Sequence, residues 1–109
     1  TGWIGGGYGE GKRIKLEYTR AMIKAALEGN LGKYSYEDYH IHSVFGVAQP
    51  RHCPGIPTQI LSPRSTWNND EKYYEAAFKL ANAFRVNFEK FIEQTPEEIL
   101  RGGPQRFAY

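Results

Sequence analysis

A glycine-rich stretch near the start of the chain has the pattern G-x-x-x-x-G-K from Gly6 to Lys12. In a P-loop this pattern is followed by Ser or Thr, whose hydroxyl binds Mg²⁺ while the loop's backbone N–H groups hold phosphate. Arg13 stands at that position, and a guanidinium has only donors, so it cannot replace the metal-binding hydroxyl. Three interpretations stay open: a P-loop without its metal ligand, a loop for another ligand, or a structural turn.

A second candidate site contains His40 and His42 with Asp38 beside them. Alternate residues share one face of a strand, so two imidazoles and a carboxylate could begin a zinc site. Only His52 and Cys53 could complete the ligand set, and a proline-rich segment separates them from the pair, so we expect no metal site. We also expect Cys53 to be a packed thiol rather than a nucleophile, because adjacent side chains of an extended chain point apart.

Charge and composition restrict the classes of partner. The 109 residues suffice for about one domain, and the net charge is +2. Residues 1–33 carry six basic and three acidic side chains, which suits a small anion but not a long nucleic acid. No apolar run approaches the ~20 residues that span a bilayer. From the charge and the short apolar runs we expect no binding to nucleic acid or to a membrane. The single cysteine fits a reducing compartment, so we expect a cytoplasmic protein.

The first part of the chain predicts one helix, one strand and one irregular segment. Residues 18–28 have helical periodicity, with Gly29 and Asn30 as the stop. Residues 34–47 alternate as a strand would, with Tyr39, Ile41 and Phe45 on one face and the histidines and Val44 on the other. Four prolines between 50 and 63 predict an extended, rigid segment that is neither helix nor central strand.

Residues 69–94 predict the longest helix, because apolar side chains recur there at steps of three and four. These side chains are Tyr74, Ala77, Phe78, Ala81, Phe84, Phe88, Phe91 and Ile92. Asn68 and Glu71 resemble a capping box at the start of this helix. A last short helix is predicted with Thr95 as N-cap, Pro96 at its first position, Glu98 as capping partner and Gly102 as its stop. The size of this apolar stripe indicates that the helix packs against a large protein surface.

Three stretches of the sequence resemble motifs of ATP-dependent phosphoenolpyruvate carboxykinases. TGWIGGGYGEGKRIKLEYTRAMIKAAL resembles N-T-G-W, a glycine-rich loop, G-K-R-[IM] and T-R-A-[IL]-[IL]. FGV…CPGIPTQILSPRSTW resembles F-G-L…P-G-V-P-x-x-[IV]-L-x-P-R-N-T-W, with Ser65 in place of Asn. LANAFRVNFEKF resembles L-A-x-x-F-x-x-N-F-x-K-F. Together, in this order, the motifs extend over essentially the whole chain.

The resemblance implies a mixed α/β fold in which this chain is the C-terminal piece of the nucleotide-binding domain. The parent enzyme would decarboxylate oxaloacetate and phosphorylate the enolate with ATP, giving phosphoenolpyruvate, CO₂ and ADP in gluconeogenesis. Mg²⁺ would accompany the nucleotide and Mn²⁺ would occupy the substrate site. The family's P-loop, metal ligands and substrate arginines lie upstream of this region, so the chain alone would contain no catalytic residue and no metal ligand and would be inactive.

The resemblance assigns Arg13, Ile14 and Thr19 to the adenosine end of ATP, so the glycine-rich loop would not be the P-loop. The residue types agree with that role, because glycines let the backbone approach a flat base and a guanidinium stacks on a π-face. Thr19 offers a hydroxyl near the start of a helix, and Lys12 is a further candidate for contact with phosphate.

We therefore treat residues 1–109 as a single partial domain of three segments: 1–33 with the nucleotide loop and helix, 34–68 with the strand and proline-rich segment, and 69–109 with the C-terminal helices. The expected partners are ATP or ADP and the remainder of the parent enzyme. Two other interpretations stay open. The chain could be a stand-alone, non-catalytic nucleotide-binding module, or a structural fragment that binds nothing until it docks on its N-terminal part.

Overall fold

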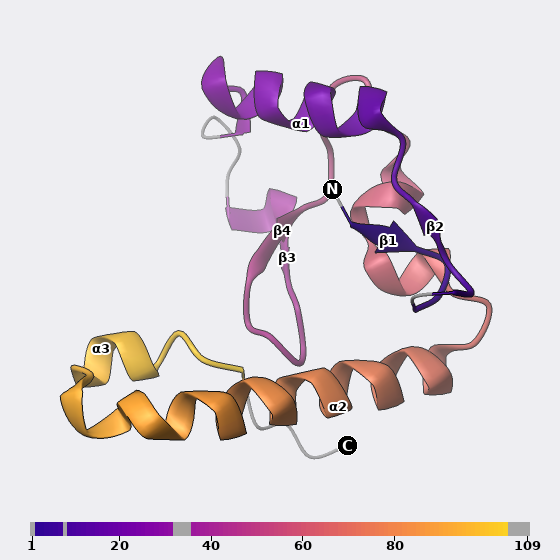
Figure 1. The fold of residues 1–109 in the computed structure, drawn as a ribbon. Helices are drawn as coiled ribbons and strands as arrows, with labels where there is room; N and C mark the ends of the chain where they lie inside the picture. Colours follow the sequence, from indigo (N-terminus) through magenta and orange to yellow (C-terminus); the bar gives the residue numbers. More distant parts are fainter. Residues whose placement is uncertain (1, 8, 32–35, 105–109) are drawn as a thin grey trace.

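Helices and two short antiparallel hairpins form the part of the chain that the computed structural model describes, residues 2–7, 9–31 and 36–104 (Figure 1). The strands are β1 (Trp3–Ile4), β2 (Lys12–Arg13), β3 (Tyr39–Ile41) and β4 (Ala48–Pro50). The α-helices are α1 (Leu16–Leu27), α2 (Asp70–Phe88) and α3 (Glu97–Leu100). Short 3-10 helices are η2 (Tyr36–Asp38), η3 (Thr58–Leu61), η4 (Pro63–Thr66) and η5 (Glu89–Gln94). The fold is a mixture of helices and small sheets, as predicted, with α1 and α2 at opposite ends and the hairpins between them.

Helix α1 begins at Leu16, two residues earlier than predicted, and ends at Leu27. Its end has the hydrogen bonds of a Schellman motif: the N–H of Gly29 donates to Ala26 O at 3.2 Å, and the N–H of Asn30 donates to Ala25 O at 3.0 Å. Gly29 has a φ of +76°, which glycine adopts without the steric penalty that a Cβ would bring. The predicted stop at Gly29 and Asn30 is confirmed.

The single strand predicted over 34–47 is wrong. Within the described part of that range only Tyr39–Ile41 is a strand, and residues 34 and 35 lie outside the described part. The chain turns after His42, because the N–H of Gly46 donates to His42 O at 2.8 Å and the N–H of His42 donates to Val47 O at 2.9 Å. Phe45 therefore lies in a turn instead of sharing a strand face with Tyr39.

The proline-rich segment is not extended throughout. Its start is β4, which pairs antiparallel with β3 and places Tyr39 opposite Pro50. The segment then folds into η3 and η4, and Pro63 occupies the beginning of η4. Proline fixes φ near −65°, a value that suits a 3-10 turn as well as an extended chain, and this explains the error.

Helix α2 continues into η5, so the predicted long helix is confirmed in position but changes its geometry at Glu89. The predicted capping residue is wrong by one position: Asn69 is the N-cap, and its side-chain oxygen accepts from the N–H of Lys72 at 3.0 Å. At α3 the N-cap is Pro96 and not Thr95. The Thr95 hydroxyl instead donates to Phe91 O at 2.5 Å, so it closes the end of η5.

The core is small and lies where the turn after β3 meets the middle of α2. Val44, Ala77 and Ala81 are buried together, and three partly buried rings surround them. These rings belong to Phe45, Tyr74 and Phe78. The two alanines let the turn approach the helix closely, because a larger side chain at either position would hold the two backbones apart.

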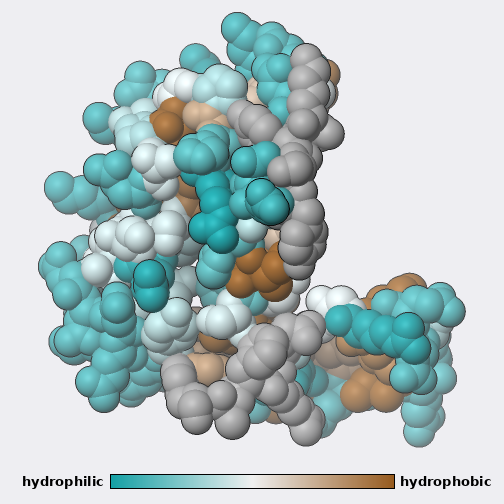
Figure 2. Space-filling model, turned by 180° about the vertical axis from the view of Figure 1, so that it is seen from behind, coloured by the Kyte–Doolittle hydropathy of each residue, from teal (hydrophilic) through white to brown (hydrophobic). Residues whose placement is uncertain are grey.

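The molecule exposes more surface than a closed domain of its size. Its accessible surface is 8483 Å², whereas a folded monomer of 12.5 kDa exposes about 6,200 Å². Its radius of gyration is 15.5 Å, against about 13 Å expected for a compact domain of this length. The excess includes an α2–α3 arm, formed by the C-terminal half of α2 with η5 and α3, where hydrophobic residues gather on the surface (Figure 2). Its exposed apolar side chains are Phe84, Val86, Phe88, Phe91, Ile92, Ile99 and Leu100.

In the part of the chain that the structure describes, no helix combines the length and the apolar character needed to cross a membrane.

Candidate functional site

The glycine-rich stretch forms the loop of the β1–β2 hairpin. The strands pair with Trp3 opposite Arg13 and Ile4 opposite Lys12, and the N–H of Gly11 donates to Gly7 O at 2.8 Å. Gly11 is required by close approach, because a Cβ there would lie 2.3 Å from the carbonyl oxygen of Gly6. A P-loop leads from a strand directly into a helix. Here the loop leads into a second strand, and Lys12 is on that strand, so this is not P-loop geometry.

A hydrogen bond attaches the hairpin to the proline-rich segment. The N–H of Gly5 donates to the Thr66 hydroxyl oxygen at 3.0 Å. That hydroxyl donates in turn to Pro63 O at 2.7 Å, which fixes its orientation. Sequence reasoning missed Thr66 because 61 residues separate it from Gly5. The connection sets the position of the glycine loop relative to η4.

The three residues expected to contact adenosine lie on one continuous stretch of the chain. Arg13 is exposed on β2, Ile14 is half-buried in the link to α1, and Thr19 is half-buried within the first turns of α1. The N–H of Ile14 donates to Gly2 O at 2.9 Å, so the link stays attached to the first strand. The hairpin thus fixes the backbone of Arg13 and Ile14 just ahead of the helix that carries Thr19.

Trp3 is the residue that sequence reasoning did not single out at this site. It is the cross-strand partner of Arg13, and directly opposed residues project their side chains on the same face of a hairpin. Trp3 is 47% exposed. Lys12 precedes Arg13 on the strand and therefore projects to the opposite face. An aromatic ring and a guanidinium thus share one exposed face, whereas the lysine faces the other way.

The two histidines expected on one strand face have different environments. His40 is exposed, whereas His42 is buried and its Nε2 lies 2.6 Å from the Tyr73 hydroxyl. Nδ1 of His42 accepts from the N–H groups of Val44 and Phe45, each at 3.1 Å. Nδ1 therefore has no proton, and the Nε2–H donates to Tyr73. Burial, and to a lesser degree the charge of His40, lowers the pKa of His42, which favours the same neutral imidazole.

This arrangement makes His42 a structural residue, because both of its ring nitrogens are used inside the protein. Tyr73 is likewise held neutral: burial first, and then the neighbouring Tyr74, raises the pKa of its phenol, while Arg64 acts in the opposite direction. The pair connects the turn after β3 to α2. The sequence alone could not indicate this connection, since 31 residues separate the two side chains.

Cys53 is buried, and desolvation raises the pKa of its thiol. A nucleophilic cysteine needs a lowered pKa and access to substrate, so the packed thiol expected from sequence is the better description. Within residues 2–7, 9–31 and 36–104, no cluster of three or more His, Cys, Asp or Glu side chains could hold a metal ion.

Known proteins with similar sequences are phosphoenolpyruvate carboxykinases. A family model described as phosphoenolpyruvate carboxykinase matches residues 1–59. The chain is 51% identical over 104 residues to a phosphoenolpyruvate carboxykinase (ATP) of Flavobacterium johnsoniae, and 51% identical over 106 residues to one of Bacillus subtilis. A third relative, phosphoenolpyruvate carboxykinase (ATP) 1 of Moorella thermoacetica, is 50% identical over 103 residues. The matches cover 94–95% of this chain but only 19% of each relative, so the chain spans about a fifth of their length.

Proposed function

The chain belongs to the phosphoenolpyruvate carboxykinase family, and on that premise we propose that it is the C-terminal, purine-binding part of a longer ATP-dependent enzyme. The complete enzyme would convert oxaloacetate and ATP to phosphoenolpyruvate, CO₂ and ADP. In this proposal residues 1–33 bind the nucleotide, while 34–68 and 69–109 support them and connect them to the rest of the enzyme.

The observation that carries the proposal is the placement of Arg13. It is exposed on a hairpin whose loop is glycine-rich, shares a face with Trp3 and directly precedes α1. A planar guanidinium on a fixed backbone suits stacking on a purine ring. Ile14 would supply apolar contact beside the base, and Thr19 would supply a hydroxyl to a polar atom of the nucleoside. The donor and apolar groups present therefore fit the adenosine end of ATP.

The divalent metals of the proposed reaction have no fitting ligand set in the described residues. The described residues of the hairpin also lack the strand–loop–helix geometry of a P-loop. Phosphoryl transfer depends on metal ions and donors positioned at the phosphates, so these groups would come from other parts of the enzyme. The role of this chain is then to bind and orient the nucleotide through its base.

Binding at the base is remote from the phosphorus–oxygen bond that breaks. Contacts there are equally strong in the ground state and in the transition state, so they affect KM rather than kcat. In the full-length enzyme, Arg13→Ala should raise the KM for ATP roughly tenfold, for a stacking loss of about 1–2 kcal/mol. Arg13→Lys should restore little, because an ammonium does not stack as a plane. Thr19→Val should have a smaller effect in the same direction.

Steady-state kinetics with each substrate varied in turn is the measurement. Lys24→Ala is the matched control, since it removes an exposed cation from the last turn of α1. The KM for oxaloacetate should not change in any variant. A hundredfold decrease in kcat with an unchanged KM for ATP in Arg13→Ala would place Arg13 at the transferring phosphate and contradict the proposal.

A further inference from the structure

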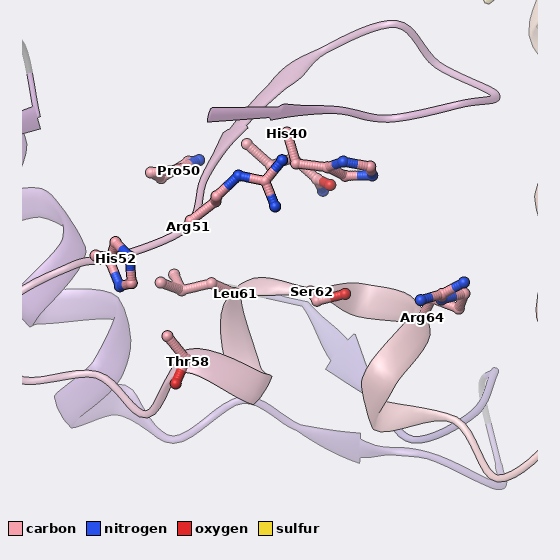
Figure 3. Close-up of a pocket in the computed structure, with 9 residues that line it drawn as sticks. His40, Pro50, Arg51, His52, Thr58, Leu61, Ser62 and Arg64 are labelled. Carbon is pink, nitrogen blue, oxygen red and sulfur yellow. The ribbon is translucent and has the colours of Figure 1, made fainter. Parts of the chain in front are cut away.

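A positively charged groove lies between the β3–β4 hairpin and the η3–η4 segment. Its volume is about 390 Å³, within the range of sites for small molecules. In Figure 3, His40 and Arg51 project from the hairpin side, while Leu61, Ser62 and Arg64 lie on the facing segment. None of Arg13, Ile14 and Thr19 lines this groove, so it is separate from the proposed purine site.

The lining of the groove concentrates cations and contains no carboxylate. Two guanidinium groups and two imidazoles line it, from His40, Arg51, His52 and Arg64, and no Asp or Glu is among the lining residues. In the described part of the chain neither arginine pairs with a carboxylate. Both arginines are exposed, so water screens the repulsion between them, and an anion that contacts both guanidinium groups would gain favourable charge interactions.

Arg51 is held in place by the backbone around it. Its Nε donates to Glu37 O at 3.2 Å, and its own N–H donates to Asp38 O at 2.8 Å. The guanidinium extends toward His40 in Figure 3. With Nε bonded to a carbonyl, the terminal nitrogens are the donors directed along the groove. A guanidinium fixed in this way loses less conformational entropy when it binds an oxyanion.

A smaller cavity of about 120 Å³ continues the groove. It shares His40, Ser62 and Arg64 with the larger one and reaches the buried pair of His42 and Tyr73. The side wall of the groove is therefore next to the buried pair of His42 and Tyr73. Arg64 lines both cavities, and its charge also opposes the rise in the pKa of the Tyr73 phenol.

We propose that this groove binds a small oxyanion, with Arg51 and Arg64 as the charged contacts and the Ser62 hydroxyl as a polar contact. The shared chemistry is that of phosphate or carboxylate oxygens, which accept hydrogen bonds from guanidinium groups in a fork geometry. The site would be additional to the proposed nucleotide site, whose residues Arg13, Ile14 and Thr19 do not line the groove.

Calorimetric titration of the full-length protein carrying this chain tests the site. The protein is kept saturated with ADP, so that its nucleotide site is filled, and is titrated with inorganic phosphate and, separately, with succinate. We expect one of the two anions to bind. Arg51→Gln and Arg64→Gln should each weaken that binding roughly tenfold or more. Lys79→Gln, which removes an exposed cation from α2 outside the groove, should leave it unchanged.

ADP affinity should be the same in all variants, which separates this site from the purine site. Ser62→Asp supplies a carboxylate inside the groove and should abolish binding of the added anion while the melting temperature stays equal or rises. If an arginine variant fails to fold, Ser62→Asp still tests the proposed oxyanion site. The proposal is overturned if neither anion binds at millimolar concentration, if all variants bind equally well, or if Ser62→Asp binds like the wild type.

Discussion

The packed half of α2, from its start to Ala81, and the exposed half after Ala81 have the same sequence pattern and different surroundings. In the packed half, Ala77 is buried and Ala81 is fully buried against the turn that contains Val44. In the exposed half, Phe84 is 52% exposed and Phe88 is 37% exposed, although they continue the same stripe. Helical periodicity therefore determines which face of a helix is apolar. Whether another element buries that face depends on the tertiary structure.

Where no other described element covers the apolar face of α2, the arm exposes apolar side chains around a cavity. The α2–α3 arm encloses a cavity of about 560 Å³ that includes Phe84, Phe88 and Ile99 among its lining residues. Exposed apolar patches of several hundred Å² are typical of surfaces that another protein element covers. In the proposed full-length enzyme, the remainder of the protein would cover this arm.

The largest expected effect comes from placing one charge in each half of α2. Ala81→Asp puts a carboxylate against Val44 with no partner, and should lower the free energy of unfolding by about 3 kcal/mol or more. Phe88→Asp puts the same charge in the exposed half and should change it by less than about 1 kcal/mol. Denaturant unfolding of the 109-residue chain, at concentrations low enough for light scattering to show a monomer, measures both. Equal effects of the two substitutions would show that the halves do not differ as described.

Self-association is the next expected effect. The 109-residue chain by itself should associate through the α2–α3 arm, because the apolar surface there has no cover. Replacing Phe84 and Phe88 together by Lys should shift the population toward monomer in light scattering. Leu27→Lys is the control, since Leu27 is 83% exposed but lies on α1 at the other end of the molecule. A monodisperse wild-type monomer with a sharp melt would contradict this prediction.

The contribution of the packed half of α2 to the free energy of unfolding should depend on pH, because His42 packs against it. The contribution of the exposed half should not. His42 must stay neutral to accept two N–H groups, so its folded pKa lies below the ordinary value of 6.5. The unfolded chain then binds the proton more readily. Stability contributed by His42 is present above pH 6.5 and is lost as the pH falls from 6.5 toward the folded pKa, by at most about 1.4 kcal/mol per pH unit.

Unfolding curves at several pH values measure this dependence. His42→Asn should reduce the slope between about pH 6.5 and 5.5. His40→Gln, the exposed neighbour, should retain most of it. If the slope disappeared in His40→Gln and persisted in His42→Asn, the titrating group would be His40. The structural role of His42 would then be contradicted.

The smallest expected effect concerns the start of α2. Asn69→Ala removes the side-chain oxygen that accepts from the N–H of Lys72 and should cost about 1 kcal/mol. Asn68→Ala should change stability by less than about 0.5 kcal/mol, because Asn68 precedes the cap. Thermal unfolding of the two variants under the same conditions measures the difference. A larger effect at Asn68 would restore the capping residue predicted from sequence.

The sequence by itself determined the local elements of this protein. The positions of α1 and α2, the glycine stop at Gly29 and the apolar face of α2 follow from periodicity and backbone preference, which act over a few neighbouring residues. The glycine pattern and the motifs around Arg13 and Thr19 also identified the family correctly. The capping residue at Asn69 was missed because Asn68 and Asn69 are chemically equivalent, and only the local backbone angles select one of them.

Only the tertiary structure decided which distant residues meet. The contact of Gly5 with Thr66, the pairing of His42 with Tyr73 and the groove between Arg51 and Arg64 each join segments that no short-range pattern connects. Strand 34–47 was overestimated for the same reason, since the turn at Val44 forms where it packs on α2. Alternation and proline content describe what a segment can do locally. Burial against a remote helix decides which of these conformations is stable.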